Sequence, residues 1–262
     1  YIQNKTADPA VIAADDRGSY VIPILSGHIG GANALAKKLA AKIGAAAVIT
    51  TATDINGRFS ADEWAARNNC HISDLTLAKE ISAGILEGDI PFFSDFQIKG
   101  GLWGGLTNAG KGETGIALSY RNIKPFGKTL LLIPRVITLG IGCHKGIKTE
   151  EIERAVKLAA DDNGISEYAF ENIASIDLKA KEEGLLEFAR KRGLPLTFYG
   201  AEELQSAEGE FSASEYVKSI TGVDNVCERA AALKSGGQLI VRKQALGGVT
   251  VAMALRNYVA KL

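Results

Sequence analysis

The sequence predicts an α/β protein with two domains that have mainly parallel sheets and are joined by a small variable middle module. Strand-like apolar segments alternate with amphipathic helical segments in the first and last thirds of the 262 residues. Glycine-rich turns follow two of these strands, and the intervening region loses the alternation. We therefore expect an N-terminal α/β domain over 1–57, the middle module over 58–135 and a C-terminal α/β domain over 136–262.

Composition limits the classes of protein that fit. Hydrophobic residues make up 46% of the chain, enough for a substantial core, and 30 basic residues balance 30 acidic ones. Such neutrality argues against nucleic acid or an anionic membrane as the main partner. There is no membrane-spanning apolar run and no signal peptide. Three cysteines without a CxxC pair favour a reducing cytoplasm. The sequence does not begin with Met, so we expect the natural N-terminus to lie upstream.

The first elements form a strand–helix–strand unit. Residues 19–25 read as a buried strand and residues 46–54 as the next one. Between them, Leu35, Leu39 and Ile43 share one helical face, which we expect to be buried, and the glycine after this helix is a plausible C-cap. A βαβ unit of this kind implies parallel pairing.

The middle module is less regular. Residues 60–69 predict a helix with Ser60 as N-cap and Glu63 completing a capping box. A second helix is expected over 75–86. The stretch "KGGLWGGLTNAGKGETG" contains seven glycines, which suit hairpin turns or an irregular loop.

Regular alternation returns in the last third. A strand leads into the turn "GIGCHKG", and Thr149 is expected to cap a helix whose buried stripe is Ile152, Val156 and Ala159. Further segments follow in the order expected of a complete α/β domain. Strands are expected over 171–179, 194–200, 238–243 and 248–255, and helices over 183–193, 212–222 and 225–236.

The glycine-rich turns give weak support for nucleotide binding. "SGHIGGAN" at 26–33 has neither the dinucleotide fingerprint nor a Walker lysine, and "GIGCHKG" is one residue too long for that fingerprint. Taken singly, each turn is better explained by the need of strand-to-helix turns for glycine.

His28 makes the first turn a candidate catalytic site. The amides of Gly30 and Gly31 would open the following helix and could hold an oxyanion or a carboxylate beside a histidine able to activate water. A histidine that only bonds to its own loop is the competing interpretation. Ser26 precedes this turn but lacks the G-x-S-x-G elbow of a nucleophile, so a cap or turn role suits it better.

Two further sets of polar side chains are candidates for contact with a ligand. Asp54 ends the strand "TTATD", so it should share the carboxyl edge of the sheet with His28, either orienting it or binding substrate; an Asx turn is the alternative. Lys179 with Glu182, and Lys243, would suit a substrate rich in carboxylates, although each could be an ordinary surface residue. The Cys–His pairs at 70–71 and 143–144 do not predict a metal site, because adjacent strand residues point to opposite faces. Cys143 itself is expected to pack rather than to react.

Taken together, these stretches resemble the cobalt-precorrin-5A hydrolase family of anaerobic cobalamin (vitamin B12) biosynthesis. The resemblance rests on "SGHIGGANALAKKLA", "VITTATDINGRFSADEWA", "LGIGCHKG", "ASIDLKAKEEGLLEFA", "PLTFYGAEEL" and "VRKQALGGVTVAMA", in the family's order. The chain departs from the family at Lys181 and Glu183, where acidic and proline residues are expected. It also omits a strand and helix that normally precede "KTADPAV", so 1–57 would be the remainder of the first domain.

The resemblance implies a hydrolase that opens the δ-lactone of cobalt-precorrin-5A and releases acetaldehyde to give cobalt-precorrin-5B. No cofactor is implied, because the substrate carries the cobalt, and no protein-bound metal is expected. Partners would be this small corrinoid and, as a further expectation, a second copy in a homodimer. A non-catalytic tetrapyrrole-binding accessory protein is the alternative, and a nucleotide-binding regulator a weaker one. The implied catalytic residues are His28 and Asp54, and the implied substrate-binding residues are Ser26, Gly30, Gly31, Asn33, Thr53, Lys179, Glu182 and Lys243.

Overall fold

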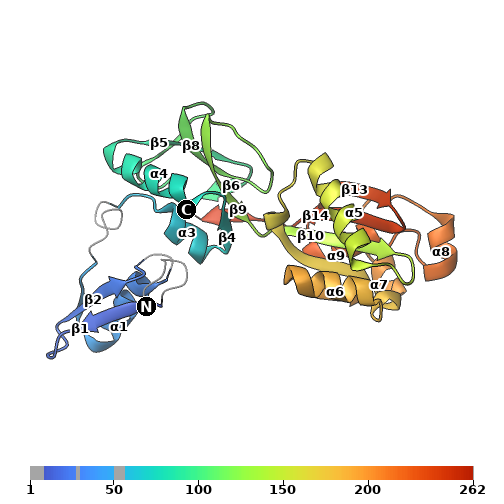
Figure 1. Ribbon diagram of the computed structural model, residues 1–262, viewed down its shortest axis with the longest axis horizontal. Coiled ribbons are helices and arrows are strands. Elements are labelled where there is room, and N and C mark those ends of the chain that lie inside the picture. The colour runs from blue at the N-terminus through green and yellow to red at the C-terminus, as the bar shows by residue number, and fades with distance from the viewer. Residues whose placement is uncertain (1–8, 28–29, 50–56, 262) are drawn as a thin grey trace. The chain divides into compact units, whose positions relative to one another are not determined.

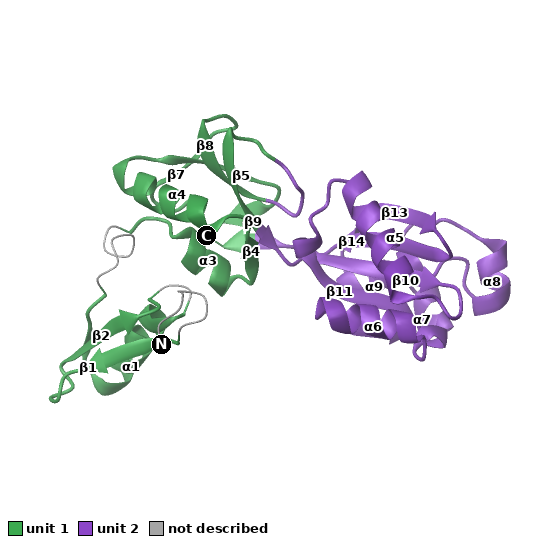
Figure 2. Ribbon diagram, in the orientation of Figure 1, with its two compact units in different colours: residues 1–118, 124–132, 260–262 green, residues 119–123, 133–259 purple. Residues whose placement is uncertain are grey.

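The computed structural model describes residues 9–27, 30–49 and 57–261. The chain forms two compact units, each built from helices and sheets (Figures 1 and 2). Unit 1 comprises residues 1–118, 124–132 and 260–262, and unit 2 comprises residues 119–123 and 133–259. The α/β prediction is confirmed, whereas the division into three segments stays a prediction. No helix within the described ranges is long and apolar enough to cross a membrane.

The first part of unit 1 is a three-stranded sheet with one helix. Its elements are β1 (Val11–Ala14), β2 (Tyr20–Leu25), α1 (Ala32–Ile43) and β3 (Ala46–Ala47). The strand order is β1-β2-β3; β1 is antiparallel to β2, and β3 is parallel to it. The predicted βαβ unit is therefore confirmed, as is Gly44 as the left-handed C-cap of α1.

The buried face of α1 differs from the prediction. Ala36 and Ala40 pack with Val21 of β2 in the core, whereas Leu35 is 42% and Ile43 49% exposed. Small alanine side chains let the helix backbone approach the sheet closely, which a row of leucines would prevent. The expected stripe was therefore wrong for Leu35 and Ile43, whereas Leu39 is half-buried and packs against this cluster. Apolar periodicity alone does not say which of two neighbouring stripes is small enough to pack closely.

The rest of unit 1 contains a second sheet in the order β4-β9-β8-β5-β7, in which β9, β8, β5 and β7 are parallel. The glycine-rich stretch contains β7, which runs parallel to β5, so the hairpin alternative was wrong. At the end of the chain, β15 (Val259–Lys261) pairs with β6. The elements of this part are α3 (Ala61–Arg67), β4 (Cys70–Ile72), α4 (Leu75–Glu87), β5 (Ile90–Ser94), β6 (Gln97–Lys99), β7 (Leu106–Asn108), β8 (Thr114–Leu118) and β9 (Lys128–Pro134).

The two helices of this part are capped by aspartates. Ser60 is the N-cap of α3, but its side chain does not cap; its hydroxyl bonds to Asp62, whose carboxylate accepts the Glu63 amide. The predicted capping box is therefore wrong. Asp74 caps α4 by accepting two amide hydrogens from the first turn.

Unit 2 contains one five-stranded sheet in the order β12-β11-β10-β14-β13. The first three strands are parallel, and β14 is antiparallel to both of its neighbours. All the expected strands and helices of the last third are present, and α7 is additional. The elements are β10 (Ile137–Cys143), α5 (Thr149–Asp162), β11 (Phe170–Ile176), α6 (Glu183–Arg192), β12 (Leu196–Tyr199), α7 (Ala201–Gln205), α8 (Glu215–Thr221), α9 (Cys227–Ser235), β13 (Gln238–Leu246) and β14 (Val249–Leu255).

Packing in unit 2 explains two features of the sequence. The expected stripe of α5 is buried, with each of its three residues at most 1% exposed. Gly140 lies in β10 against the start of α9, where an added Cβ would stand 1.8 Å from the Cys227 carbonyl oxygen. This glycine therefore permits close helix–strand packing. The expected cap Thr149 is instead the first residue of α5, and its hydroxyl donates to the Glu187 carboxylate at 2.7 Å.

Candidate functional site

Lys179 and Glu182 meet at the carboxyl edge of the unit 2 sheet, as predicted. They follow β11 on a 3₁₀ turn (Asp177–Lys179) and the loop after it. The Lys179 ammonium lies 3.5 Å from one Glu182 oxygen, and the other oxygen accepts the Gly146 amide at 2.6 Å. The two side chains are only 17% and 10% exposed, so they are not ordinary solvated surface residues.

The turns after β10 and β11 fit tightly together. Gly146 has a φ of 75°, a left-handed conformation that favours glycine. A Cβ on Gly184 would lie 2.1 Å from the Ile147 carbonyl oxygen, so only glycine allows α6 to begin there. The Glu182 bond to Gly146 therefore joins two turns that already touch, and it holds the Lys179 ammonium at a defined place on the edge.

The Cys143 thiol lies in the same cluster. Burial raises its pKa to about 11, while the Lys179 charge lowers the pKa and the Glu182 charge raises it. The thiol is thus protonated at neutral pH, which supports a packing role rather than a nucleophilic one. No cluster of three or more His, Cys, Asp or Glu side chains suited to a metal occurs among the residues that the structure describes.

Lys243 lies in a separate local environment on β13. Its backbone amide donates at 2.7 Å to Glu228, a residue of α9 that is 0% exposed. The Lys243 charge lowers the pKa of the Cys227 thiol, although burial raises that pKa to about 12 overall. Sequence reasoning missed Glu228, because an acidic residue in the first turn of a helix usually serves only the helix dipole.

The turn after β2 is strained and crowded. Ser26 has a φ of 57°, unusual for a residue with a side chain, and its buried hydroxyl has no hydrogen-bond partner among the described residues. A Cβ on Gly30 would lie 2.2 Å from the Ser26 Cβ, so this position requires glycine. The amides of Ala32 and Asn33 donate back to the carbonyls of residues 26 and 27.

These return bonds shape the start of α1. Gly31 is the N-cap with φ 80°, and Asn33 is only 3% exposed. The N-terminus of a helix is the positive end of its dipole, which favours an anionic group beside this turn. His28, Thr53 and Asp54 lie outside the described residues.

A pocket of about 360 Å³ lies elsewhere, beside the amino ends of β11 and β12. It contains no predicted site residue, and Arg192 in its wall is already paired with Glu167. The pocket is lined by Arg135, Glu167, Tyr168, Phe170, Arg192 and Leu194.

Comparison with known proteins covers nearly the whole chain. Residues 1–54 match the family "Cobalamin synthesis G N-terminal", and residues 137–254 match "Cobalamin synthesis G C-terminus". A cobalt-precorrin-5A hydrolase of Priestia megaterium is 31% identical over 280 residues, covering 98% of this chain and 74% of that protein. The chain belongs to the cobalt-precorrin-5A hydrolase family.

Two other relatives support and extend this assignment. The cobalt-precorrin-5A hydrolase of Salmonella typhimurium is also 31% identical, over 98% of this chain and 77% of its own length. Protein CobE of a Sinorhizobium species is 31% identical over 121 residues, which is 45% of this chain and 79% of that protein.

Proposed function

We propose that this protein opens the δ-lactone of cobalt-precorrin-5A and releases acetaldehyde, giving cobalt-precorrin-5B in anaerobic cobalamin biosynthesis. The observation that carries the proposal is the 31% identity to hydrolases of this name along 98% of the chain. The match therefore includes both the turn after β2 and the carboxyl edge of the unit 2 sheet. A likeness confined to one unit would have supported only a shared domain.

Lactone opening requires a base, an attacking water and donors for the acyl oxygen. In our proposal His28 takes the proton from water, Asp54 orients His28, and the amides of Gly30 and Gly31 stabilise the oxyanion. Their place at the N-terminus of α1, the positive end of the helix dipole, supports this role. When the tetrahedral intermediate collapses, the acyl–oxygen bond breaks, leaving a ring A carboxylate and a hydroxyl on the former meso carbon.

Release of acetaldehyde completes the reaction. The new hydroxyl loses its proton to a base, its oxygen forms the aldehyde C=O, and the carbon–carbon bond to the macrocycle breaks. The electron pair of that bond passes to the ring, whose conjugation and cobalt can accept it. For this reason we propose no cofactor besides the cobalt of the substrate.

Further residues are assigned to substrate binding. Ser26, Asn33 and Thr53 would contact the lactone region, and Lys179 and Lys243 would bind peripheral carboxylates. Among the residues that the structure describes, the buried Ser26 hydroxyl has no partner, as expected of a group that binds a ligand. Because protein donors already engage both oxygens of Glu182, this residue would act by holding Lys179 in place.

The test is anaerobic incubation with the lactone intermediate and an assay for acetaldehyde. His28→Ala should lower the rate by about 10²–10⁴-fold, the usual contribution of a general base. His28→Gln is the sharper variant, because it keeps a hydrogen-bonding side chain that cannot accept a proton near neutral pH. Turnover near the wild-type rate in His28→Gln would rule out the catalytic assignment of His28.

A non-catalytic tetrapyrrole-binding accessory role is the second candidate. It is favoured by the match of 45% of this chain to 79% of Protein CobE, which shows that a protein of this pathway can consist of less than half of this chain. Binding of the corrinoid without acetaldehyde formation would support this candidate over the hydrolase. A cytoplasmic location, a homodimer and the absence of a nucleic-acid partner stay predictions; the free state of all three cysteines agrees with a reducing compartment.

A further inference from the structure

Glu228 has a carboxylate that is completely buried and that the proposed chemistry does not use. One oxygen accepts the Lys243 amide at 2.7 Å and the Ser212 hydroxyl at 2.9 Å. The other oxygen accepts the Ser212 amide at 2.7 Å. A buried carboxylate is costly unless donors satisfy both oxygens. Glutamine could not replace it, because its NH₂ group would face a donor.

An irregularity in β13 lets the Lys243 backbone amide donate to this carboxylate instead of to the neighbouring strand. The register between β13 and β14 shifts between Val241 and Gln244, which leaves Lys243 in a bulge. A bulge removes a residue from the ladder and redirects its side chain. Glu228 supplies the acceptor that the ladder does not provide at this point. The carboxylate therefore fixes the backbone that carries Lys243.

The position of Lys243 relates it to the strand end where Lys179 lies. Its charge acts on the Cys227 thiol, and the Cys227 carbonyl oxygen packs against Gly140 of β10. Lys179 acts on the thiol of Cys143 at the end of the same strand. In the sheet, β11, which precedes Lys179, and β13, which carries Lys243, stand on opposite sides of β10, so the two lysines lie on either side of that strand. Among the described residues, the Lys243 ammonium forms no ion pair.

We propose that Glu228 is a positioning residue for Lys243, and that it fixes this cation to bind one peripheral carboxylate of the corrinoid while Lys179 binds another. The inference rests on the proposed function for the class of ligand, a planar macrocycle with several carboxylates. Two cations held at a fixed separation select a ligand by the spacing of its acidic groups. Each cation has its own glutamate: Glu182 holds the Lys179 ammonium, and Glu228 holds the Lys243 backbone.

The experiment is a double-mutant cycle read out by equilibrium binding to the full-length protein. The probe is cobyrinic acid, a cobalt corrinoid with free carboxylates, and its fully methyl-esterified form is the uncharged probe. Lys243→Met keeps the apolar stem and should weaken binding of the acid about tenfold to a hundredfold, the range for one charge-assisted hydrogen bond. Glu228→Gln should weaken binding in the same direction. Neither change should affect the ester.

Non-additivity distinguishes positioning from a structural role. If Glu228 acts through Lys243, Glu228→Gln should cause no further loss of acid binding in the Lys243→Met background. Additive losses, or unchanged acid binding by folded Glu228→Gln protein, would overturn the proposal. If Glu228→Gln does not fold, Glu228→Asp keeps the charge but withdraws it by one methylene from the Lys243 amide. Full acid affinity in the folded Asp variant would equally overturn it.

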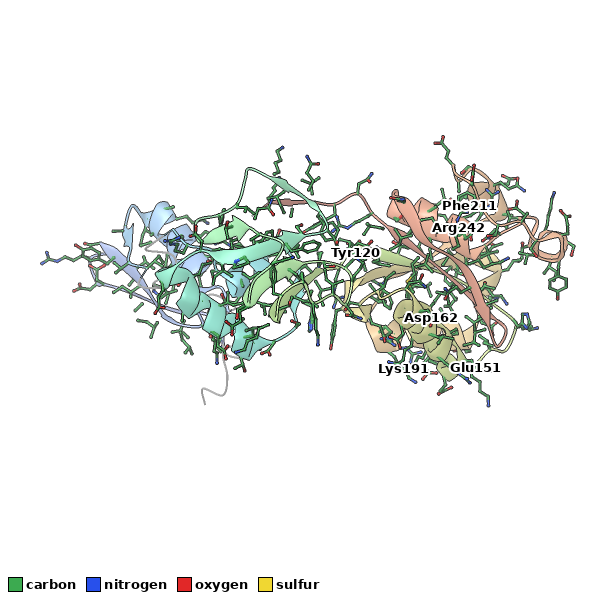
Figure 3. The ribbon with its side chains drawn as sticks, turned by 90° about the horizontal axis from the view of Figure 1, so that it is seen from above. Tyr120, Glu151, Asp162, Lys191, Phe211 and Arg242 are labelled. Atoms are coloured by element: carbon green, nitrogen blue, oxygen red, sulfur yellow. The ribbon has the colours of Figure 1, made fainter. Side chains whose placement is uncertain are left out.

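Arg242 provides the matched control. It is adjacent to Lys243, its side chain is 59% exposed, and it donates to the Glu210 carbonyl at 2.5 Å. Its guanidinium also lies 3.9 Å from one Glu228 oxygen, but the hydrogen bonds that hold this carboxylate are all 2.9 Å or shorter, so loss of the more distant charge should leave Glu228 in place. It lies near Phe211 at the surface of unit 2 (Figure 3). Arg242→Gln should leave acid binding unchanged; a loss equal to that of Lys243→Met would show a general charge effect and refute the specific assignment.

This experiment separates the inference from the proposed function. If the variants lose acid binding non-additively but the unchanged protein forms no acetaldehyde, the positioning role of Glu228 is supported and the hydrolase proposal is refuted. If the unchanged protein forms acetaldehyde but Glu228→Gln binds the acid undiminished, the hydrolase proposal is supported and the positioning role of Glu228 is refuted. Failure of the wild-type protein to prefer the acid over the ester would overturn the inference directly.

Discussion

Gly140→Ala tests whether close packing of α9 against β10 organises unit 2. The added Cβ would lie 1.8 Å from the Cys227 carbonyl oxygen and 2.9 Å from the Ala231 Cβ. The first distance is roughly 1.5 Å shorter than an ordinary van der Waals contact. Because the clashing atom is a backbone oxygen, no change of side-chain rotamer relieves the clash. We expect destabilisation at the upper end of overpacking costs, about 3 kcal/mol. This corresponds to a fall in the urea midpoint of roughly 1 M or more.

Two optical probes and one control variant localise the effect. Both tryptophans of the chain, Trp64 and Trp103, belong to unit 1, so their fluorescence follows that unit alone, whereas far-UV circular dichroism follows both. Gly140→Ala should shift the dichroism transition and spare the fluorescence transition. The control is Gly84→Ala in α4, whose added Cβ would contact only the Ile90 side chain, at an ordinary 3.5 Å. This change should stabilise unit 1 by up to about 1 kcal/mol, because alanine favours a helix over glycine. An unshifted dichroism transition in Gly140→Ala would refute the packing argument.

Three further predictions concern the site residues. Burial raises the pKa of Cys143 from an ordinary 9.0 to about 11, so its neutral thiol favours the folded state below pH 9 and this contribution is lost towards pH 11. Alkylation of Cys143 should accordingly stay slow at pH 8, as mass spectrometry would detect, and fast labelling would contradict the burial. Lys179→Met and Glu182→Gln should each lower the thermal midpoint because each leaves a partner unpaired, while the double variant should recover stability but not corrinoid binding; calorimetry that finds additive losses would oppose this. Ser26→Ala should keep or slightly raise stability, because the hydroxyl has no described partner, yet lower lactone turnover; unchanged turnover would remove Ser26 from the site.

Local patterns predicted most elements of unit 2. Buried strands and the α5 stripe follow from periodicity, and those signals agree with the packing that the structure shows. The prediction failed where two nearby side chains could each fill one structural position, such as a helix cap or a buried face. Asp62 rather than Glu63 receives the bonds at the start of α3. In α1, Ala36 and Ala40 form the buried face against β2, while Leu35 and Ile43 are exposed. Such choices depend on tertiary distances that a single sequence does not contain.

The candidate site was partly predictable for a similar reason. Lys179 and Glu182 are three residues apart after a strand, so sheet topology predicted their shared edge. Glu228 could not be found in this way, because its partners lie 15 and 16 residues away in sequence, and one of them, Lys243, meets it at a bulge. Whether His28 and Asp54 lie beside the amides of Gly30 and Gly31 stays a prediction.

The return of β15 to unit 1 has a consequence for how the protein is made. Ala260 is fully buried there, and the Trp64 indole donates to the Lys261 carbonyl at 2.7 Å. These contacts come from residues that the ribosome adds only after all of 133–259. Because chains emerge at about 5–20 residues per second, unit 1 must wait several seconds for its last strand while unit 2 is being synthesised. A chaperone that shields β6 in that interval should therefore bind nascent chains stalled before residue 259 and release them once the strand has emerged.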